Sequence, residues 1–316
     1  MGKVILTRLA RLLATLLAVT FLTFLLVALL PGDPVDTILG QVERTPEIEE
    51  RIRSDLNLDD PFFARYFQWL GDAAQGDLGE SYINSGTTVS SIIQDRIPIT
   101  AQLSLMAITF ALVLAIPIGI TGAYKQGRWQ DSTTSAGVQV ALSIPNFVIG
   151  IFLVWIFSVK LGWLPATGWT RFSKDYWGNL KGALLPASAL AMTQMAIFSR
   201  LIRADMIATL QENYILAARS KGLSDRFILA RHALRPSSLS LMTIVGINFG
   251  ALLGGTVVIE QLFGIGGLGG ALYAAITKRD ILVIQGITVF IATVYVVINT
   301  AVDLLYAVVD PRIRKG

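Results

Sequence analysis

Six long windows of the chain contain no Asp, Glu, Lys or Arg, and the segments between them are polar and often densely charged. At a rise of ~1.5 Å per residue, about 20 residues cross the hydrocarbon core of a bilayer. A charge at mid-span costs roughly 2.5–3.5 kcal/mol, so charge-free windows of this length indicate membrane spans. The pattern predicts six transmembrane helices, at 12–32, 97–124, 132–159, 182–199, 236–259 and 281–302.

The alternative for the first window is a cleaved secretory signal, because Lys3, Arg8 and Arg11 precede it. The apolar region of a signal peptide spans ~7–15 residues and ends at a small-x-small cleavage site. This window is longer, and Ala28-Leu29-Leu30-Pro31 offers no such site. We therefore expect a retained first helix.

The charges between the windows predict the orientation, because an even number of spans places both termini on one side. If that side is the cytoplasm, the inner segments hold 15 basic and 6 acidic residues, and the outer segments hold 11 and 16. Lys and Arg concentrate on the cytoplasmic side of membrane proteins, and only the outer segment 160–181 opposes this rule. We expect both termini in the cytoplasm, with inner segments 1–11, 125–131, 200–235 and 303–316, and outer segments 33–96, 160–181 and 260–280.

Composition agrees with a membrane protein, since 53% of the residues are hydrophobic and only 15% are charged. Soluble domains carry about 25% charged residues, so that class is excluded. The absence of cysteine excludes disulfides and thiolate metal sites. The net charge of +4 is the difference between a basic inner side and an acidic outer side, so it gives no support to a nucleic-acid partner.

The outer segment 33–96 is the longest one outside the predicted spans. Thr45-Pro46-Glu47 predicts a helix start, with a capping hydroxyl, a proline at the first position and an acid near the positive end of the helix dipole. We expect this helix to end near Leu56. An aromatic cluster follows before Gly71, and we expect it to pack against the membrane-facing wall, with a ligand box as the alternative. The cluster comprises Phe62, Phe63, Tyr66, Phe67, Trp69 and Leu70.

The sequence does not support a nucleotide-binding site or a protease site. The run 264–269 has the glycine spacing of a dinucleotide loop, but a predicted span precedes it where that site needs a strand. We expect a flexible loop or re-entrant gate at the outer mouth, built on Gly264, Gly266, Gly267 and Gly269. The chain has no phosphate-binding G-x-x-x-x-G-K-[ST] motif, and its single histidine, His232, excludes an H-E-x-x-H site and an intramembrane Ser-His protease.

The six windows hold no ionisable residue, which disfavours a proton- or ion-coupled carrier. They do hold neutral amides, which need a partner or water at membrane depth. These amides either pack the helices together or line a transport path, and the sequence leaves both open: Asn146, Gln194, Asn248 and Asn299. Small residues recur every four positions at Gly246, Gly250 and Gly254, which permits close helix approach.

The inner segment 200–235 predicts a helical hairpin. Residues 213–223 favour a short helix with Gly222 as its C-terminal cap, and a second helix from Ser224 to Leu234 should stop before Pro236. We expect Ala217 and Ala218 to lie on one small-residue face. The hairpin suits docking into a groove of a partner, and a polybasic segment resting on anionic lipid is the open alternative.

The same segment carries a family resemblance. Ala217-Ala218-x-x-x-Gly222 resembles the EAA loop of ATP-binding-cassette importer permeases, although Leu216 replaces the usual Glu. Asn213-Tyr214-Ile215, Ala218-Arg219-Ser220-Lys221-Gly222-Leu223 and His232-Ala233-Leu234-Arg235 are similar to the dipeptide, oligopeptide and nickel group, above all to its first, B-type permease. Further motifs match in order along the chain, at 30–34, 76–81, 143–145, 161–165, 303–306 and 310–312.

The resemblance implies an all-α integral membrane protein with the six-helix type I importer (MetI-like) fold. The first helix and an extracytoplasmic region would occupy 1–96 and the permease domain 97–309. The implied partners are a second homologous permease, two cytoplasmic ATPase domains that bind ATP and Mg²⁺, and an extracytoplasmic binding protein, in a bacterial or archaeal cell membrane. This chain would have no cofactor and no ATPase site of its own.

The resemblance also implies which residues couple the chain to the ATPases, with docking by shape and by Arg219 and Lys221 in place of the missing Glu. The coupling set is Tyr214, Ala217, Ala218, Arg219, Lys221 and Gly222. The implied cargo is a dipeptide or oligopeptide. Nickel or another metal chelate, glutathione, and a stand-alone secondary carrier are the alternatives.

Overall fold

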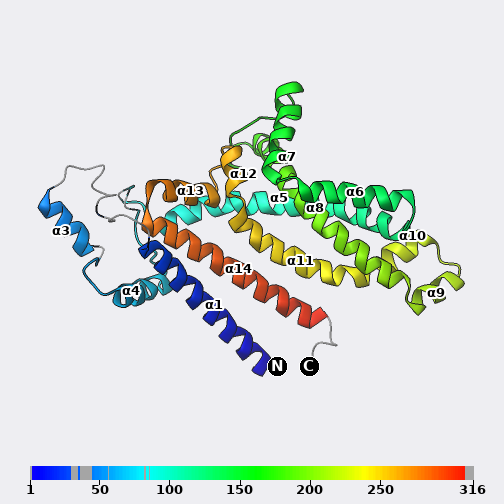
Figure 1. Cartoon of the computed structure of the whole chain (residues 1–316), viewed down its shortest axis with the longest axis horizontal. Coiled ribbons are helices and arrows are strands. Elements are labelled where there is room, and N and C mark those ends of the chain that lie inside the picture. Colours follow the sequence, from blue (N-terminus) through cyan, green and yellow to red (C-terminus); the bar gives the residue numbers. More distant parts are fainter. Residues whose placement is uncertain are drawn as a thin grey trace. The chain divides into compact units, whose positions relative to one another are not determined.

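The computed structural model describes residues 2–29, 35, 45–55, 57–81, 83–84 and 86–309 (Figure 1). These residues are mostly helical, and the only β-type pairing among them is an isolated bridge between Glu80 and Thr88. The predicted all-α class is therefore confirmed. The motifs at 30–34 and 310–312 and the predicted helix end at Leu56 lie outside the described residues.

The helices cover most of each predicted window, but the fifth window, 236–259, is divided at Thr256 between two helices. The N-terminal helices are α1 (Gly2–Ala28), α3 (Pro46–Asp55) and α4 (Phe62–Ala74). The middle of the chain forms α5 (Val89–Tyr124), α6 (Trp129–Ser143), α7 (Asn146–Leu153), the π-helix η1 (Val154–Lys160) and α8 (Tyr176–Leu210). The remaining elements are α9 (Asn213–Ser220), α10 (Asp225–Phe227), the π-helix η2 (Ile228–Ala233), α11 (Leu234–Gly255), α12 (Val257–Leu262), α13 (Leu268–Lys278) and α14 (Ile281–Val309).

The chain divides into two compact units, and the first comprises Met1–Pro98 and Gly266–Val297. One of its cores joins the start of α5 to α13 and α14, through Val89, Leu268 and Ile287. A second core joins α1 and α4 through aromatic residues. The helix predicted from Thr45-Pro46-Glu47 begins at Pro46 as expected.

The second unit comprises Ile99–Ile265 and Ile298–Gly316, and α8 is its central helix. In Figure 1, α8 lies beside α6 and α11, and it packs against α7 as well. Large side chains along α8 are fully buried, among them Phe198, Ile202 and Met206. Because its neighbours are protein helices, α8 has little surface left for lipid.

Three described helices are long and apolar enough to cross a membrane: α5, α8 and the Ile281–Val302 part of α14. Two bent pairs, α6 with α7–η1 and the stretch Asp225–Ser238 with Ser240–Gly255, raise the number to five if each pair is one span. In α1, the described apolar stretch is Ala10–Leu26.

The window 132–159 is not one straight helix, contrary to the prediction. The chain bends by 99° between α6 and α7–η1. Ile144 is extended, with φ −95° and ψ 124°, and Pro145 follows with ψ 141°. Proline disfavours helical backbone in the residue before it and has no N–H to continue the ladder, so the helix breaks there.

The second helix of the predicted hairpin does not stop before Pro236 either. The π-helix η2 runs directly into α11 at Leu234, and Pro236 is the third residue of α11. Proline removes one backbone hydrogen bond from a helix and bends the helix without always ending it, and the two helical stretches Asp225–Ser238 and Ser240–Gly255 meet at an angle of 54°. The chain therefore continues as helix where the sequence predicted a stop.

The predicted glycine stripe permits close helix approach at Gly246, within the second unit. A Cβ added at Gly246 would overlap the side chain of Val302 on α14. We expect Gly246→Ala to lower the stability of the purified chain by about 1–3 kcal/mol, because overpacking forces helices apart. Thermal unfolding in detergent measures this.

Gly137→Ala on α6 is the matched control, because a Cβ at Gly137 meets nothing within 4 Å. Alanine is the better helix former, so this control should be neutral or stabilising by up to about 1 kcal/mol. Equal melting temperatures for the two variants would contradict the packing assignment.

Candidate coupling surface and transport path

Residues 213–233, which we call the α9 hairpin, fold as α9, α10 and η2 within the second unit. Ile215, Ala218 and Ile228 form a small core beneath the hairpin, and Leu210 of α8 packs against it. Its outer surface exposes apolar side chains, namely Tyr214, Leu216, Leu223 and Phe227. Exposed apolar side chains on a short surface element are compatible with protein docking.

Gly222 ends α9, as the sequence predicted. Its φ is +74°, in the left-handed region that glycine adopts without strain. The N–H of Gly222 donates to the carbonyl of Arg219 (2.9 Å), and the N–H of Leu223 donates to that of Ala218 (3.3 Å), which closes the helix end. A Cβ at this position would meet nothing within 4 Å, so only the backbone conformation requires glycine.

The predicted coupling residues do not all reach the surface. Ala218 is buried in the hairpin core, whereas Ala217 is exposed, so the two alanines do not share a face. The expectation of one small-residue face was wrong because consecutive helical residues point about 100° apart. The other five members of the set are exposed: Tyr214, Ala217, Arg219, Lys221 and Gly222.

Tyr214 lies at the edge of the hairpin. Its hydroxyl donates to the carbonyl of His232 at 3.4 Å, a long hydrogen bond. Partial burial, and to a smaller extent the charge of Glu212, raise the pKa of Tyr214 above its usual value of 10.0. The side chain is therefore neutral at physiological pH and presents a polar but uncharged group.

A single side-chain contact ties the hairpin to the end of α5. The hydroxyl of Tyr124 donates to a carboxylate oxygen of Asp225 at 2.6 Å. Tyr124 is the last residue of α5 and Asp225 is the first residue of α10. The pair therefore connects the hairpin directly to a long membrane-type helix, a link that the sequence did not predict.

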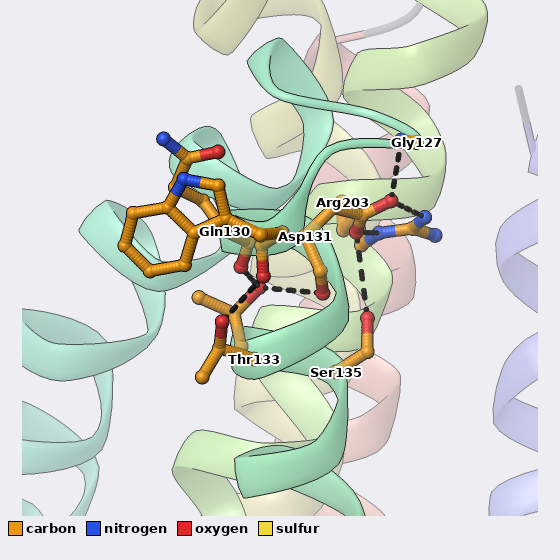
Figure 2. A network of polar contacts seen from close by, with 8 residues as sticks. Gly127, Gln130, Asp131, Thr133, Ser135 and Arg203 are labelled. Atoms are coloured by element: carbon orange, nitrogen blue, oxygen red, sulfur yellow. Dashed lines mark hydrogen bonds and ion pairs between the residues drawn. The ribbon is translucent and has the colours of Figure 1, made fainter.

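A buried ion pair lies nearby in the sequence, at the start of α6. Arg203 of α8 donates to Asp131 through Nε (2.7 Å) and Nη2 (2.9 Å), and the N–H of Gly127 adds a third bond (3.0 Å). Figure 2 shows Asp131 surrounded by Arg203, Gly127 and Ser135. Charge counting placed both residues on the inner side but could not pair them, because 72 residues separate them.

The four amides proposed for the path belong to the second unit, but the structure records no hydrogen bond between any two of them. Asn146 is the first residue of α7, after the break at Pro145, and Asn248 bonds to the Ile244 carbonyl of its own helix (2.8 Å). Gln194 Oε1 and Asn299 Oδ1 are buried without a hydrogen-bond partner in the described part of the chain. Such atoms are where water or a cargo molecule would bind.

A buried carboxylate lies one residue beyond the fifth window. Glu260 of α12 is fully buried and accepts hydrogen bonds from Thr100 of α5 and from Thr256, each at 2.8 Å. Glu260 lies just outside the charge-free windows, in the predicted outer segment 260–280, so its complete burial was not expected from the sequence.

The glycine run 264–269 is less open than a flexible loop. Gly264 is exposed with φ +62°, whereas Gly267 and Gly269 are buried at the start of α13. In the first unit, the carbonyl of Gly266 accepts a hydrogen bond from Arg96 Nη1 (2.8 Å). A Cβ at Gly266 would overlap that guanidinium, so a larger residue here would displace the Arg96 side chain.

Comparison with known families decides the identity. Residues 115–315 match the inner membrane component of binding-protein-dependent transport systems, and residues 1–104 match the N-terminal part of the membrane component of such systems. The chain belongs to this family. It is a binding-protein-dependent permease and a multi-pass protein of the cell membrane.

The relatives of this permease match over nearly their whole length. A Brucella abortus protein named as a candidate peptide transport system permease is 40% identical over 314 residues, 99% of each chain. The oligopeptide transport system permease of Bacillus subtilis is 36% identical, with 95% of each chain covered. The glutathione transport system permease of Shigella flexneri is 35% identical, with 98% of each chain covered.

Among solved structures, the inward-facing MetNI methionine transporter contains a chain similar to this permease. The TM-score is 0.54 at 18% identity, and the alignment covers 69% of this chain and 96% of that one. At this identity the likeness shows the fold alone, which is the MetI-like permease fold.

Proposed function

We propose that this chain is one permease subunit of an ATP-driven importer of peptides. The observation that carries the proposal is the full-length similarity to permeases named for peptide, oligopeptide and glutathione transport. Glutathione is itself a short peptide, so these names agree on a cargo class. No residue of the described chain favours nickel or another metal chelate over a peptide.

The proposed topology has six spans and cytoplasmic termini. Three described helices are long enough to cross, and the two bent pairs and α1 would supply the other three. The distribution of Lys and Arg supports this orientation, because the inner segments are basic and the outer segments acidic. In this arrangement the α9 hairpin faces the cytoplasm.

The proposed partners follow from the transport system. A second homologous permease would complete the pathway, and two cytoplasmic ATPase domains would bind ATP and Mg²⁺, for which this chain has no phosphate-binding loop. An extracytoplasmic binding protein would deliver cargo to region 33–96 and to the glycine run 264–269. The exposed apolar surface of the hairpin, flanked by Arg219 and Lys221, supports docking of an ATPase there.

The proposed path lies in the second unit. The partnerless amide oxygens of Gln194 and Asn299 are its strongest members, because a passing polar cargo or water would satisfy them. Asn146 and Asn248 are the weaker members, since Asn248 already bonds its own helix.

The contact between Tyr124 and Asp225 should transmit part of the coupling. Tyr124→Phe removes the hydroxyl that holds the hairpin to α5, and a surface hydrogen bond of this kind contributes about 1 kcal/mol. We expect substrate-stimulated ATP hydrolysis of the assembly to fall up to about fivefold, with the amount of co-purified ATPase unchanged.

Asp225→Ala should give the same loss, and the double variant should add nothing, because both changes remove the same hydrogen bond. Tyr273→Phe, at an exposed tyrosine on α13, is the matched control and should behave as wild type. Additive losses in the double variant would show that the two residues act separately.

The assembly itself is tested by gentle purification of the tagged chain from its native membrane. We expect a second permease and ATPase subunits to co-purify. A chain that purifies alone and moves solute under an ion gradient would favour the secondary carrier. Competition of labelled dipeptide uptake by longer peptides, glutathione and Ni²⁺ then distinguishes the cargo classes.

A further inference from the structure

The helix α4, in the first unit, carries three different stripes along its length. One stripe packs into the protein core, and its members are Phe62, Tyr66, Trp69 and Ala73. A second stripe is exposed and polar, and its members are Gln68, Asp72 and Gln75. Between them runs an exposed aromatic stripe of Phe63 and Phe67, one helical turn apart, with side chains 62% and 63% exposed.

The core stripe fixes α4 against the middle of α1. The hydroxyl of Tyr66 lies 3.0 Å from Thr20 Oγ1 and 3.4 Å from the carbonyl of Leu17. Phe21 and Phe24 pack edge-to-face on Tyr66, with ring centroids 5.4 and 5.6 Å apart. Thr20 lies eight residues before the end of α1 at Ala28, which is about 12 Å along the helix.

The contacts of α4 with α14 place α4 at the same distance from a helix end as its contacts with α1. The core stripe forms one cluster with Leu282 and Val289 of α14. Val289 lies eight residues after the start of α14 at Ile281, again about 12 Å along a helix long and apolar enough to cross the membrane. The body of α4 therefore lies beside the outer half of two apolar helices, not above them in water.

At this depth in a membrane, an exposed aromatic stripe faces lipid. On α1, Leu22 and Leu26 are 54% and 65% exposed, so the helix that packs on α4 also carries exposed apolar side chains. We propose that Phe63 and Phe67 contact lipid acyl chains in the outer leaflet, so that α4 is an interfacial helix with its polar stripe toward the headgroups. Amphipathic helices with an aromatic face and a polar face adopt this position in bilayers.

The inference rests on the proposed function in one respect, the crossing of the bilayer by α1 and α14. It changes the description of region 33–96, which was predicted to lie outside the membrane spans. Part of that region would instead widen the membrane-embedded surface of the permease.

Because the natural chain has no cysteine, single-cysteine spin labelling has no background. Labels at Phe67→Cys and Phe63→Cys, in the reconstituted assembly in phosphatidylcholine liposomes, report collisions with oxygen and with a water-soluble nickel chelate. Leu22→Cys is the lipid reference and Gln68→Cys is the matched polar reference on the same helix. Retained uptake shows that each labelled assembly is folded.

We expect the labels at Phe63 and Phe67 to give the same ratio of oxygen to chelate collisions as the label at Leu22. This ratio should be several-fold higher than at Gln68. Equal ratios at Phe67 and Gln68 would overturn the proposal, and so would shielding of Phe67 from both reagents, which indicates a protein partner. A water-like signal at Leu22 would refute the crossing by α1 and this inference with it, while co-purification of the ATPases would still test the transport function separately.

Discussion

Replacing Gly222 with valine should lower the coupling of ATP hydrolysis to transport at least about fivefold, while the chain still inserts into the membrane. The φ of +74° at Gly222 is strongly disfavoured for a β-branched residue and costs about 1–3 kcal/mol of strain. The turn that joins α9 to α10 must then rearrange, which displaces the exposed face of the α9 hairpin. A penalty of this size lowers the docking-competent population by about 5–150-fold.

Two further substitutions separate the effect of backbone strain from the effect of side-chain size. Gly222→Asn should retain most of the activity, because asparagine tolerates left-handed backbone better than other residues with a side chain. Gly222→Arg should lower coupling at least as much as valine does, by strain and by its bulk on the docking face. Substrate-stimulated ATP hydrolysis of the whole assembly is the readout, and wild-type coupling in the valine variant would refute the role of the turn.

Asp131→Asn destabilises the permease more than any surface change. The substitution removes the negative charge that pairs with the Arg203 guanidinium. The loss is large because Asp131 is only 10% exposed, so water cannot replace its carboxylate fully. Removing one partner of a buried pair costs 3–5 kcal/mol, and we expect about 2–3 kcal/mol here because Arg203 is one-third exposed. The apparent melting temperature in detergent should fall by about 3–5 °C.

The double variant Asp131→Leu with Arg203→Met should recover most of this loss, since an apolar pair replaces a paired charge at little cost. Asp72→Asn, at an exposed acid on α4, is the matched control and should change stability by less than about 0.5 kcal/mol. If Asp131→Asn and Asp72→Asn have the same melting temperature, the ion pair contributes no stability.

The sequence predicted the features that depend on neighbours along the chain. The start of α3 at Pro46 and the end of α9 at Gly222 follow from local backbone chemistry, and both are confirmed. The break at Pro145 was missed because a window without charge says nothing about backbone direction. A proline after an isoleucine inside a window was the signal that could have revealed it.

Contacts between distant residues were beyond the sequence. Glu260 pairs with Thr100 across 160 positions, and Tyr66 meets Thr20 across 46. The aromatic cluster was expected to pack, and four of its members do so beside α1, whereas Phe63 and Phe67 are exposed. No pattern in the sequence named α1 as the partner. A single chain without aligned relatives carries no record of which side chains meet.

The most direct test of the account is uptake of a labelled dipeptide into proteoliposomes. If the chain is a subunit of an ATP-driven peptide importer, uptake requires the two permeases, the ATPase subunits, the binding protein and Mg-ATP together. Omission of Mg-ATP or of the binding protein should reduce uptake to the background of empty liposomes. Uptake by this chain alone under a proton or sodium gradient, without ATP, would contradict the assignment of the chain as a subunit of an ATP-driven importer.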